Sequence, residues 1–223
     1  MHGHGTCVGI APHLEVAMPR KRRMLPVGQP CHAVNRGQDK RTLFFNSADY
    51  ERFIELMAEG KRRYPVQIYG YNLIPNHFHK ILCPMEPGAV SAYMQWVEGR
   101  YGCHFRWMTH TTGHGHVYQG RFWAEPIGTG PYHFYNVQRY VEANALAAGL
   151  CARAEDWRWG SLWERESKGR SLLDRSPLML PDDWCNIVNR LLPEPGTPGS
   201  DPYPFDDDDG KGSDPCQIEK TSW

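Results

Sequence analysis

The sequence lacks the long hydrophobic runs that mark membrane and secreted proteins. No stretch of about 18 uninterrupted apolar residues occurs. The first residues also lack the basic and apolar blocks of a secretory signal. We therefore expect a soluble, cytoplasmic protein with no membrane partner.

A cysteine framework is also missing. The seven cysteines are an odd number, they are scattered, and no two of them form a C-x-x-C pair. This pattern argues against both a disulfide-stapled protein and a zinc knuckle. We expect reduced thiols that are mostly packed in the interior.

The chain has no net charge, because 25 Lys and Arg balance 25 Asp and Glu. The charges are nevertheless unevenly placed: residues 18–170 hold 21 Lys and Arg against 13 Asp and Glu, a net +8, and the remaining segments are net −8. A basic body attracts phosphate through its long-range field and through counterion release, so nucleic acid is a candidate ligand. A solubilising surface would explain the same excess equally well.

Composition divides the chain into four segments without any internal repeat. We expect a disordered N-terminal extension over 1–17, one folded domain over 18–170, a short helical extension over 171–193 and an acidic disordered tail over 194–223. The tail is rich in Pro, Gly and Asp and cannot bury enough apolar surface to offset its ordering entropy. The composition break also makes Met18 a candidate start of the native protein, which an intact-mass measurement would test.

Within the folded domain the hydrophobic period changes several times, as it does in α+β proteins. Ser47 is the expected N-cap of the first helix, and a basic, aromatic loop is expected before the last one. The predicted strands cover 31–35, 66–73 and 78–83, and the predicted helices cover 47–63, 90–103 and 131–150.

The last predicted helix has an apolar and a polar face. Phe134, Val137 and Val141 recur at steps of three and four, and we expect this stripe to face the sheet. A polar stripe that includes Tyr140 and Asn144 lies about 100° around the axis. A tyrosine at the edge of a buried face can point into a cleft.

Two histidines share one predicted strand in the middle of the domain. His77 and His79 are two residues apart, so both imidazoles leave the same face of a strand and can converge on one ion. Phe78 points the opposite way, into apolar packing. The spacing alone is weak evidence, since it occurs twice more in Gly-rich stretches, and two satisfied or exposed histidines would explain it as well.

Six motifs, in order, resemble those of the IS200-like transposases, and in particular of the REP-associated tyrosine transposases of the HUH class. The motifs are Met18-Pro-Arg-Lys21, Asn35-Arg-Gly37, Leu73-Ile-Pro-Asn-His-Phe-His79, Gly120-Arg-Phe122, Tyr140-Val-Glu-Ala-Asn144 with Gly149-Leu150, and Glu155-Asp-Trp-Arg-Trp-Gly-Ser161. The resemblance covers about 18–170, so it makes this segment the catalytic domain. It implies an α+β, ferredoxin-like (RRM-like) fold, an antiparallel sheet with helices packed on one face.

Carried over to the matching positions, the resemblance makes Tyr140 the nucleophile and His77 and His79 the metal ligands. Asn144 lies one helical turn after Tyr140, where its amide oxygen can supply a third ligand. Related transposases have a glutamine at this kind of position, so the asparagine is a shorter substitute. Glu142 also matches the family motif, but it points away from the Tyr140 face, and we interpret it as part of a structural salt bridge.

The implied function is that of a metal-dependent transposase and endonuclease that cleaves and rejoins single-stranded DNA at hairpin-forming repeats through a 5′-phosphotyrosine. Mg²⁺ or Mn²⁺ is the expected cofactor, because cleavage needs charge neutralised on the nonbridging phosphate oxygens. The expected partner is single-stranded DNA with palindromic hairpins at the nucleoid, and a homodimer that exchanges the tyrosine helix is consistent with the family. The DNA-binding candidates are Arg20, Lys21, Arg22, Arg23, Arg36 and Arg121.

Two other functions fit parts of the sequence. RNA-recognition domains bind single strands on a ferredoxin-like sheet with aromatic and basic residues, so a non-catalytic binding module is one alternative, and a domesticated relative without mobility is a variant of it. A zinc hydrolase with a water nucleophile is the other, although no carboxylate base or third strong ligand is evident near the histidines. Only the transposase requires Tyr140 for its chemistry.

Overall fold

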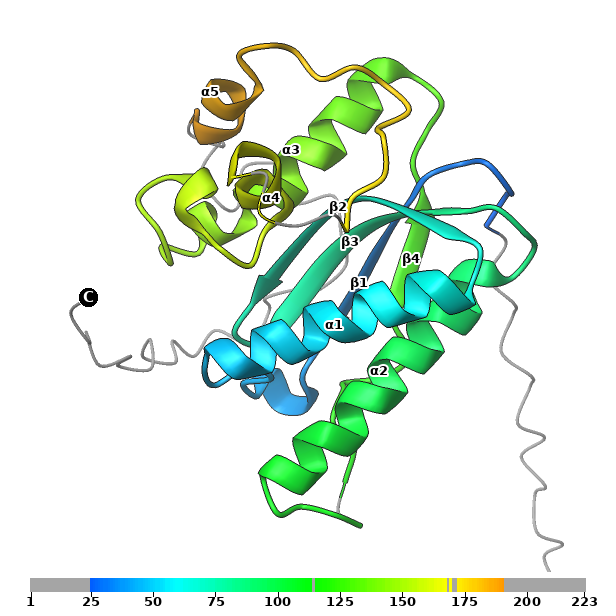
Figure 1. Ribbon diagram of the computed structural model, residues 1–223, viewed down its shortest axis with the longest axis vertical. Helices are drawn as coiled ribbons and strands as arrows, with labels where there is room; N and C mark the ends of the chain where they lie inside the picture. The colour runs from blue at the N-terminus through cyan, green and yellow to red at the C-terminus, as the bar shows by residue number, and fades with distance from the viewer. Residues whose placement is uncertain (1–24, 114, 168, 170–171, 191–223) are drawn as a thin grey trace, which may run out of the picture.

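The computed structural model describes residues 25–113, 115–167, 169 and 172–190 (Figure 1). The predicted disordered segments 1–17 and 194–223 and the cluster Arg20 to Arg23 lie outside the described residues, whereas most of the predicted helical extension 171–193 is described and contains a short helix. In the described part, no helix combines the length and the apolar character needed to cross a membrane. The elements, in chain order, are β1 Cys31–Arg36, η1 Gln38–Lys40, α1 Ser47–Arg63, β2 Val66–Ile74, β3 His77–Pro84, α2 Ala89–Met108, β4 Trp123–Pro126, α3 Pro131–Ala147, η2 Ala154–Asp156, α4 Ser161–Ser167 and α5 Trp184–Asn189.

The four strands form one antiparallel sheet in the order β2-β3-β1-β4. The first six long elements follow the sequence β-α-β-β-α-β, which is the ferredoxin-like arrangement. The predicted α+β class and antiparallel sheet are therefore confirmed. In β2 the register slips between Ile68 and Gly70, so Tyr69 is an extra residue, and both Tyr69 and Gly70 lie on the α3 side.

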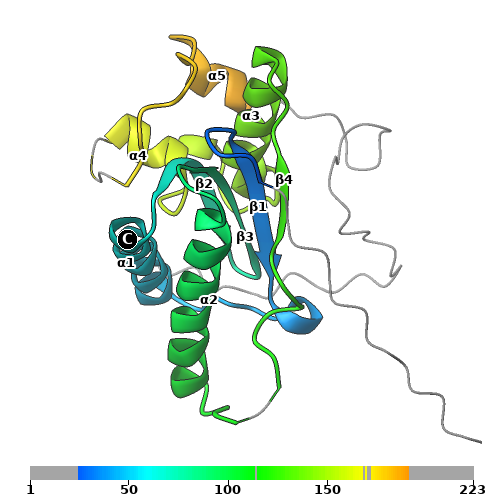
Figure 2. The ribbon, with the colours of Figure 1, turned by 90° about the vertical axis from the view of Figure 1, so that its right-hand side faces the viewer.

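Helices α1 and α2 cover one face of the sheet (Figures 1 and 2). The core between them and the sheet is dominated by aromatic side chains, and Phe53, Phe78, Tyr93 and Tyr101 are fully buried there. Edge-to-face and tilted contacts between these rings add to the energy of burying them. This apolar layer fixes the position of β3, the strand that carries His77.

The prediction that helices pack on one face of the sheet holds for α1 and α2 only. Helix α3 packs on the opposite face, where Phe134, Val137 and Val141 are buried against Tyr69 and Ile81 of the sheet. The apolar stripe predicted for this helix thus does face the sheet. The helix ends at Ala147, three residues before its predicted end, and Gly149 beyond it has a φ of 69°, the left-handed conformation that terminates helices.

Three local predictions were wrong. The N-cap of α1 is Asn46, not Ser47: the Asn46 side chain accepts hydrogen bonds from the backbone of Ala48 and Asp49, and the Asp49 carboxylate completes a capping box. Helix α2 extends to Met108, five residues beyond its predicted end. The loop predicted before α3 contains β4, a short edge strand with no fully buried residue and hence no hydrophobic period to reveal it.

Candidate active site

The polar face of the sheet, on which α3 lies, carries the candidate chemistry. In the β1–β3 register, Val34 pairs with His79 and Arg36 pairs with His77, so these four residues project from the same face. His32, two residues before Val34 on β1, joins them there. Figure 2 shows the sheet nearly edge-on, with β1 and β3 running between α2 and α3.

His77 and His79 are brought together as the sequence predicted. Their ring centroids are 5.0 Å apart and the rings are nearly perpendicular, at 76°. His79 is buried and His77 is half-buried at the open end of the strand. Burial lowers the pKa of His79 to about 3, so this imidazole is neutral at physiological pH, as a metal ligand must be.

Tyr140 lies against the histidine pair. The centroid of its ring is 5.5 Å from that of His79, in an edge-on contact at 89°, and 6.1 Å from that of His32. The side chain is half-buried, so α3 presents it at the rim of the cluster instead of in the core. The polar stripe predicted for this helix therefore faces the histidines.

Two asparagines flank His77. Asn76 Oδ1 lies 2.7 Å from His77 Nδ1, and Asn144, from the turn of α3 after Tyr140, is hydrogen-bonded to the same imidazole. Burial, His79 and Arg36 lower the pKa of His77 well below its ordinary value, and the Asn144 hydrogen bond acts in the opposite direction. Asn144 thus lies within contact of the predicted ligands, at the end of the histidine pair that is open to solvent.

The histidine pair fits a divalent ion in one specific respect. Within the described residues, His79 Nε2 is buried and has no hydrogen-bond partner, which is uncommon unless a ligand, ion or water satisfies the atom. No group of three or more His, Cys, Asp and Glu side chains in the described part is arranged to hold a metal. An ion at this site would therefore depend on two imidazoles and the Asn144 amide, which leaves several coordination positions for phosphate and water.

The described DNA-binding candidates lie in different places. Arg36 pairs with His77 across the β1–β3 ladder, and its positive charge contributes to the lowered pKa of that imidazole. Arg121 is exposed and lines a cavity of about 940 Å³ between α2 and the segment 116–122. Arg36 therefore adjoins the candidate site, whereas Arg121 belongs to a separate surface.

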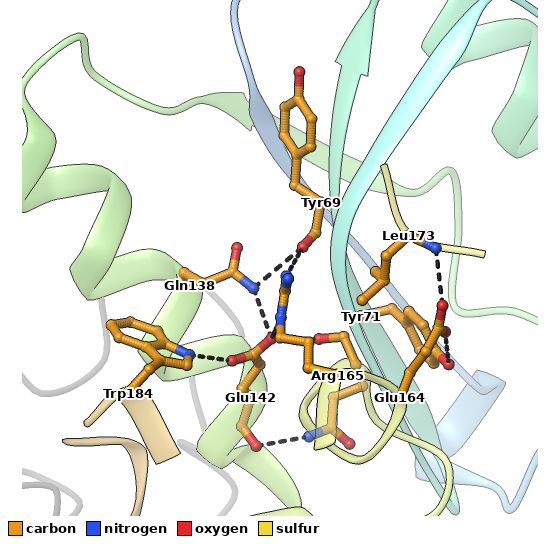
Figure 3. Close-up of polar contacts among 10 residues, drawn as sticks. Tyr69, Tyr71, Gln138, Glu142, Glu164, Arg165, Leu173 and Trp184 are labelled. Atoms are coloured by element: carbon orange, nitrogen blue, oxygen red, sulfur yellow. Dashed lines mark hydrogen bonds and ion pairs between the residues drawn. The ribbon is translucent and has the colours of Figure 1, made fainter. Parts of the chain in front are cut away.

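A network of hydrogen bonds around Glu142 anchors the helix that carries Tyr140 (Figure 3). Glu142 is 1 % exposed, and both of its carboxylate oxygens accept hydrogen bonds. The four donors are Gln138 Nε2 at 2.8 Å, Ser161 Oγ at 2.7 Å, Arg165 Nε at 3.0 Å and Trp184 Nε1 at 2.6 Å. The predicted structural salt bridge is present, and it ties α3 to α4 and α5.

The same network also joins α3 to the sheet. Gln138 and Arg165 both donate to the backbone carbonyl of Tyr69, the extra residue of β2, and Asn72 Nδ2 donates to the Glu142 carbonyl at 3.2 Å. The close-up in Figure 3 shows Gln138 and Arg165 converging on Tyr69 from α3 and α4. The position of Tyr140 relative to β3 is thus set by directional hydrogen bonds on one side of α3 and by apolar packing on another.

Sequence reasoning missed His32. Its imidazole Nε2 lies 3.0 Å from His79 Nδ1, and the two rings stack at 5.1 Å with an interplanar angle of 8°. The only sequence signal is a histidine inside a predicted apolar strand. That signal could not show that β1 pairs with β3 in the register that brings His32 next to His79.

Comparisons with known proteins give the family and the fold of this chain. The family model described as "Transposase IS200 like" matches residues 28–144. A solved structure of a REP-associated tyrosine transposase bound to a REP hairpin is similar in fold, with a TM-score of 0.55 and 18% sequence identity over 74% of this chain and 96% of that one. A candidate transposase from Deinococcus radiodurans R1 matches at a TM-score of 0.38 and 9% identity, over 56% of this chain and 96% of that one. No curated protein sequence matches the chain.

Proposed function

Because the chain belongs to the IS200-like transposase family, we propose that it is a metal-dependent endonuclease that cleaves and rejoins single-stranded DNA through a 5′-phosphotyrosine on Tyr140. The observation that carries this proposal is the position of Tyr140, whose ring centroid lies 5.5 Å from that of His79. A tyrosine that could serve as nucleophile and a candidate metal-binding pair therefore lie on one face of the sheet.

Tyr140 would act as the nucleophile. Its phenol loses a proton as the oxygen attacks the phosphorus, the bond from phosphorus to O3′ breaks, and the released oxygen takes up a proton to become a 3′-hydroxyl. The phosphate stays bonded to the 5′ oxygen of the downstream fragment and is now also an ester of Tyr140. Because the ester conserves the energy of the broken bond, the 3′-hydroxyl of another strand can attack it and reseal the DNA.

His77, His79 and Asn144 would hold a Mg²⁺ or Mn²⁺ ion. When bound, such an ion neutralises charge on the nonbridging oxygens of the phosphate. The chain itself supplies orientation: β3 fixes the imidazoles, and α3 holds the phenol against them. Arg36 adds a permanent positive charge beside His77 that suits a DNA phosphate.

The proposed substrate is single-stranded DNA that folds into palindromic hairpins. The structurally similar REP-associated transposase was solved with a REP hairpin, which supports this choice of ligand. Arg36, Arg121 and the cluster Arg20 to Arg23 are the proposed phosphate contacts, and a chromosomal substrate would place the protein at the nucleoid. Tyr140 contacts the histidines of its own chain, so one chain would suffice to form the site, whether or not a homodimer assembles.

The test is incubation of the full chain with labelled single-stranded hairpin oligonucleotides and Mg²⁺ or Mn²⁺, followed by a denaturing gel. We expect a metal-dependent covalent adduct between protein and DNA with the natural chain and none with Tyr140→Phe. Tyr135→Phe is the matched control. This tyrosine is in the same helix, but its hydroxyl donates a hydrogen bond to the backbone carbonyl of Met179 and not to a histidine. The control should form the adduct at the natural level.

The two alternatives predict different gels. A non-catalytic binding module retains hairpin binding but forms no adduct with any hairpin or metal. A zinc hydrolase cuts the DNA without an adduct and keeps this activity in Tyr140→Phe. Either outcome would remove Tyr140 from the proposed role.

A further inference from the structure

We propose that His32 is a positioning residue that fixes the tautomer and the orientation of the metal ligand His79. This inference rests on the proposed function, because it assigns His79 to a metal. It starts from the contact that the sequence could not reveal, the 3.0 Å approach of His32 Nε2 to His79 Nδ1.

A hydrogen bond between two ring nitrogens needs one proton, which belongs to one of the two histidines. If His32 donates, His79 Nδ1 is the acceptor, and the proton of a neutral His79 must sit on Nε2. If His79 donates from Nδ1, its Nε2 carries a lone pair. Only the second arrangement leaves His79 Nε2 able to bind a metal.

We assign the second arrangement to this site, because only it lets His79 bind an ion. His79 Nε2 is buried and has no hydrogen-bond partner in the part of the chain that the structure describes, so a lone pair there can accept an ion, whereas an N–H cannot. The other position for the proton, His32 Nδ1, is buried as well, so burial does not choose between the two arrangements and the ion does. His79 is then the donor to His32, and His32 carries its own proton on Nδ1.

His32 is also held rigidly enough to orient its neighbour. Its side chain is 0 % exposed and comes from β1, the strand paired with β3. The rings of Trp123 and Tyr140 contact it edge-on, at 6.0 and 6.1 Å. Residues of β1, β3, β4 and α3 thus enclose one imidazole pair, and rotation of the His79 ring would break the contact with His32.

Metal-binding histidines commonly donate their second N–H to a carboxylate, a carbonyl or water, and loss of that acceptor typically weakens metal binding by about 10–100-fold. In this chain an imidazole takes the place of the usual acceptor. Unlike a carboxylate, it adds no negative charge beside the site, so the metal and the phosphate would meet a neutral pocket apart from Arg36.

The experiment combines two readouts on the full chain. Long-range ¹H–¹⁵N NMR of the metal-free protein reports which ring nitrogen of His79 is protonated, and electron paramagnetic resonance of Mn²⁺ reports its affinity. The variants are His32→Phe, which keeps a ring but removes the acceptor, and His32→Gln, whose amide oxygen can still accept. Trp123→Phe is the matched control, because it changes another ring that contacts His32.

We expect His79 to be protonated on Nδ1 in the natural chain. His32→Phe should weaken Mn²⁺ binding by about 10–100-fold and release His79 into a mixture of tautomers. His32→Gln should recover most of the affinity, and Trp123→Phe should match the natural chain. Thermal unfolding without metal shows whether each variant is folded. If His32→Phe does not fold, the tautomer of His79 in the natural chain and the Mn²⁺ affinity of His32→Gln still test the inference.

Two results would overturn the inference: a proton on His79 Nε2 in the natural chain, or unchanged Mn²⁺ affinity in folded His32→Phe. Failure of the proposed function would look different. In that case the natural chain forms no Tyr140 adduct and binds Mn²⁺ no better than His77→Ala, whatever the tautomer of His79.

Discussion

The two faces of the sheet differ in chemistry, and β3 shows the difference residue by residue. Phe78 and Leu82 point into the aromatic core under α1 and α2, whereas His77 and His79 point toward α3. The first face is filled by mostly aromatic side chains that stabilise the fold chiefly by burial. The second holds polar groups whose positions depend on hydrogen bonds. The comparison teaches that one face maintains the scaffold while the other carries the candidate site.

Within the polar face, the side chains of Glu142 and His79 differ in how well their own polar atoms are satisfied. Glu142 accepts hydrogen bonds from four side chains, so its negative charge is fully compensated inside the protein. His79, by contrast, keeps a buried nitrogen without a hydrogen-bond partner among the described residues. A carboxylate whose two oxygens both accept hydrogen bonds needs no further partner, whereas a buried imidazole nitrogen without one can accept a ligand. Glu142 therefore belongs to the support of α3, and His79 to the site.

Substitution of adjacent residues on β3 should separate stability from chemistry most strongly. Phe78→Ala should lower the free energy of unfolding by about 3–5 kcal/mol, because it leaves a cavity in the aromatic core. His79→Gln should cost only about 1 kcal/mol, for the hydrogen bond to His32, yet abolish the DNA adduct. Urea unfolding and the adduct gel measure the two effects. Equal losses of stability would show that both faces serve the fold alike.

Glu142 tests the polar support of α3. Glu142→Ala should destabilise the protein by about 3 kcal/mol, because it leaves the half-buried Arg165 without its counter-charge and the buried donors of Gln138, Ser161 and Trp184 without their acceptor. Adduct formation should fall with it, since α3 loses its connections to α4 and α5. Glu142→Gln keeps the shape and one acceptor and should cost less. Urea unfolding of the two variants, followed by the adduct gel under conditions where both are folded, makes the measurement. If the free energy of unfolding of Glu142→Ala equalled that of the natural chain, apolar packing alone would hold α3 in place.

The difference between the faces also explains what could be predicted from the sequence. Local periodicity within each segment was enough to predict β1, β2, β3, the long helices and the apolar stripe of α3. It also placed His77 and His79 on one face of the same strand. The assignment of Tyr140 and Asn144 came from a family resemblance, and the structure places both beside the histidines.

The missed features depend on contacts between distant segments. β4 is a short strand that exists through its pairing with β1, and the His32–His79 contact depends on the β1–β3 register. The packing of α3 on the second face likewise depends on tertiary contacts, which the hydrophobic period of one helix does not specify. Polar sites assembled across strands are thus the hardest part of this fold to infer from sequence.

Lys80 is the exception on the apolar face and tests whether that face tolerates charge. It is 0 % exposed, and its Nζ lies 4.4 Å from the ring centroid of Phe78 and 4.6 Å from that of Phe53. Burial lowers its pKa to about 7, and Glu98 partly opposes this shift. Lys80→Met should therefore stabilise the protein at pH 7, by about 1–4 kcal/mol on the scale seen when buried charges are replaced.

The sign of the pH dependence follows from the lowered pKa. Between pH 7 and the ordinary lysine pKa of about 10.4, the unfolded chain binds a proton at Lys80 that the folded chain has released. Stability of the natural chain should rise with pH in that window, and the advantage of Lys80→Met should shrink. Urea unfolding of both proteins at pH 7 and pH 9.5 measures the difference. An advantage independent of pH would mean that Lys80 stays charged in the core.

The smallest expected change in the free energy of unfolding concerns the start of α1. This helix packs on the apolar face of the sheet, opposite the histidines. Asn46→Ala removes the side chain that caps Ala48 and Asp49, and should cost about 1 kcal/mol. Ser47→Ala, at the neighbouring position that the sequence favoured as the cap, should leave the free energy of unfolding nearly unchanged. Both variants should form the DNA adduct at the natural level, because α1 contacts the site only through the core. If Ser47→Ala lowered the free energy of unfolding more than Asn46→Ala, the N-cap would be Ser47. If Asn46→Ala abolished the DNA adduct, stability on the apolar face and chemistry on the polar face would be coupled through the sheet.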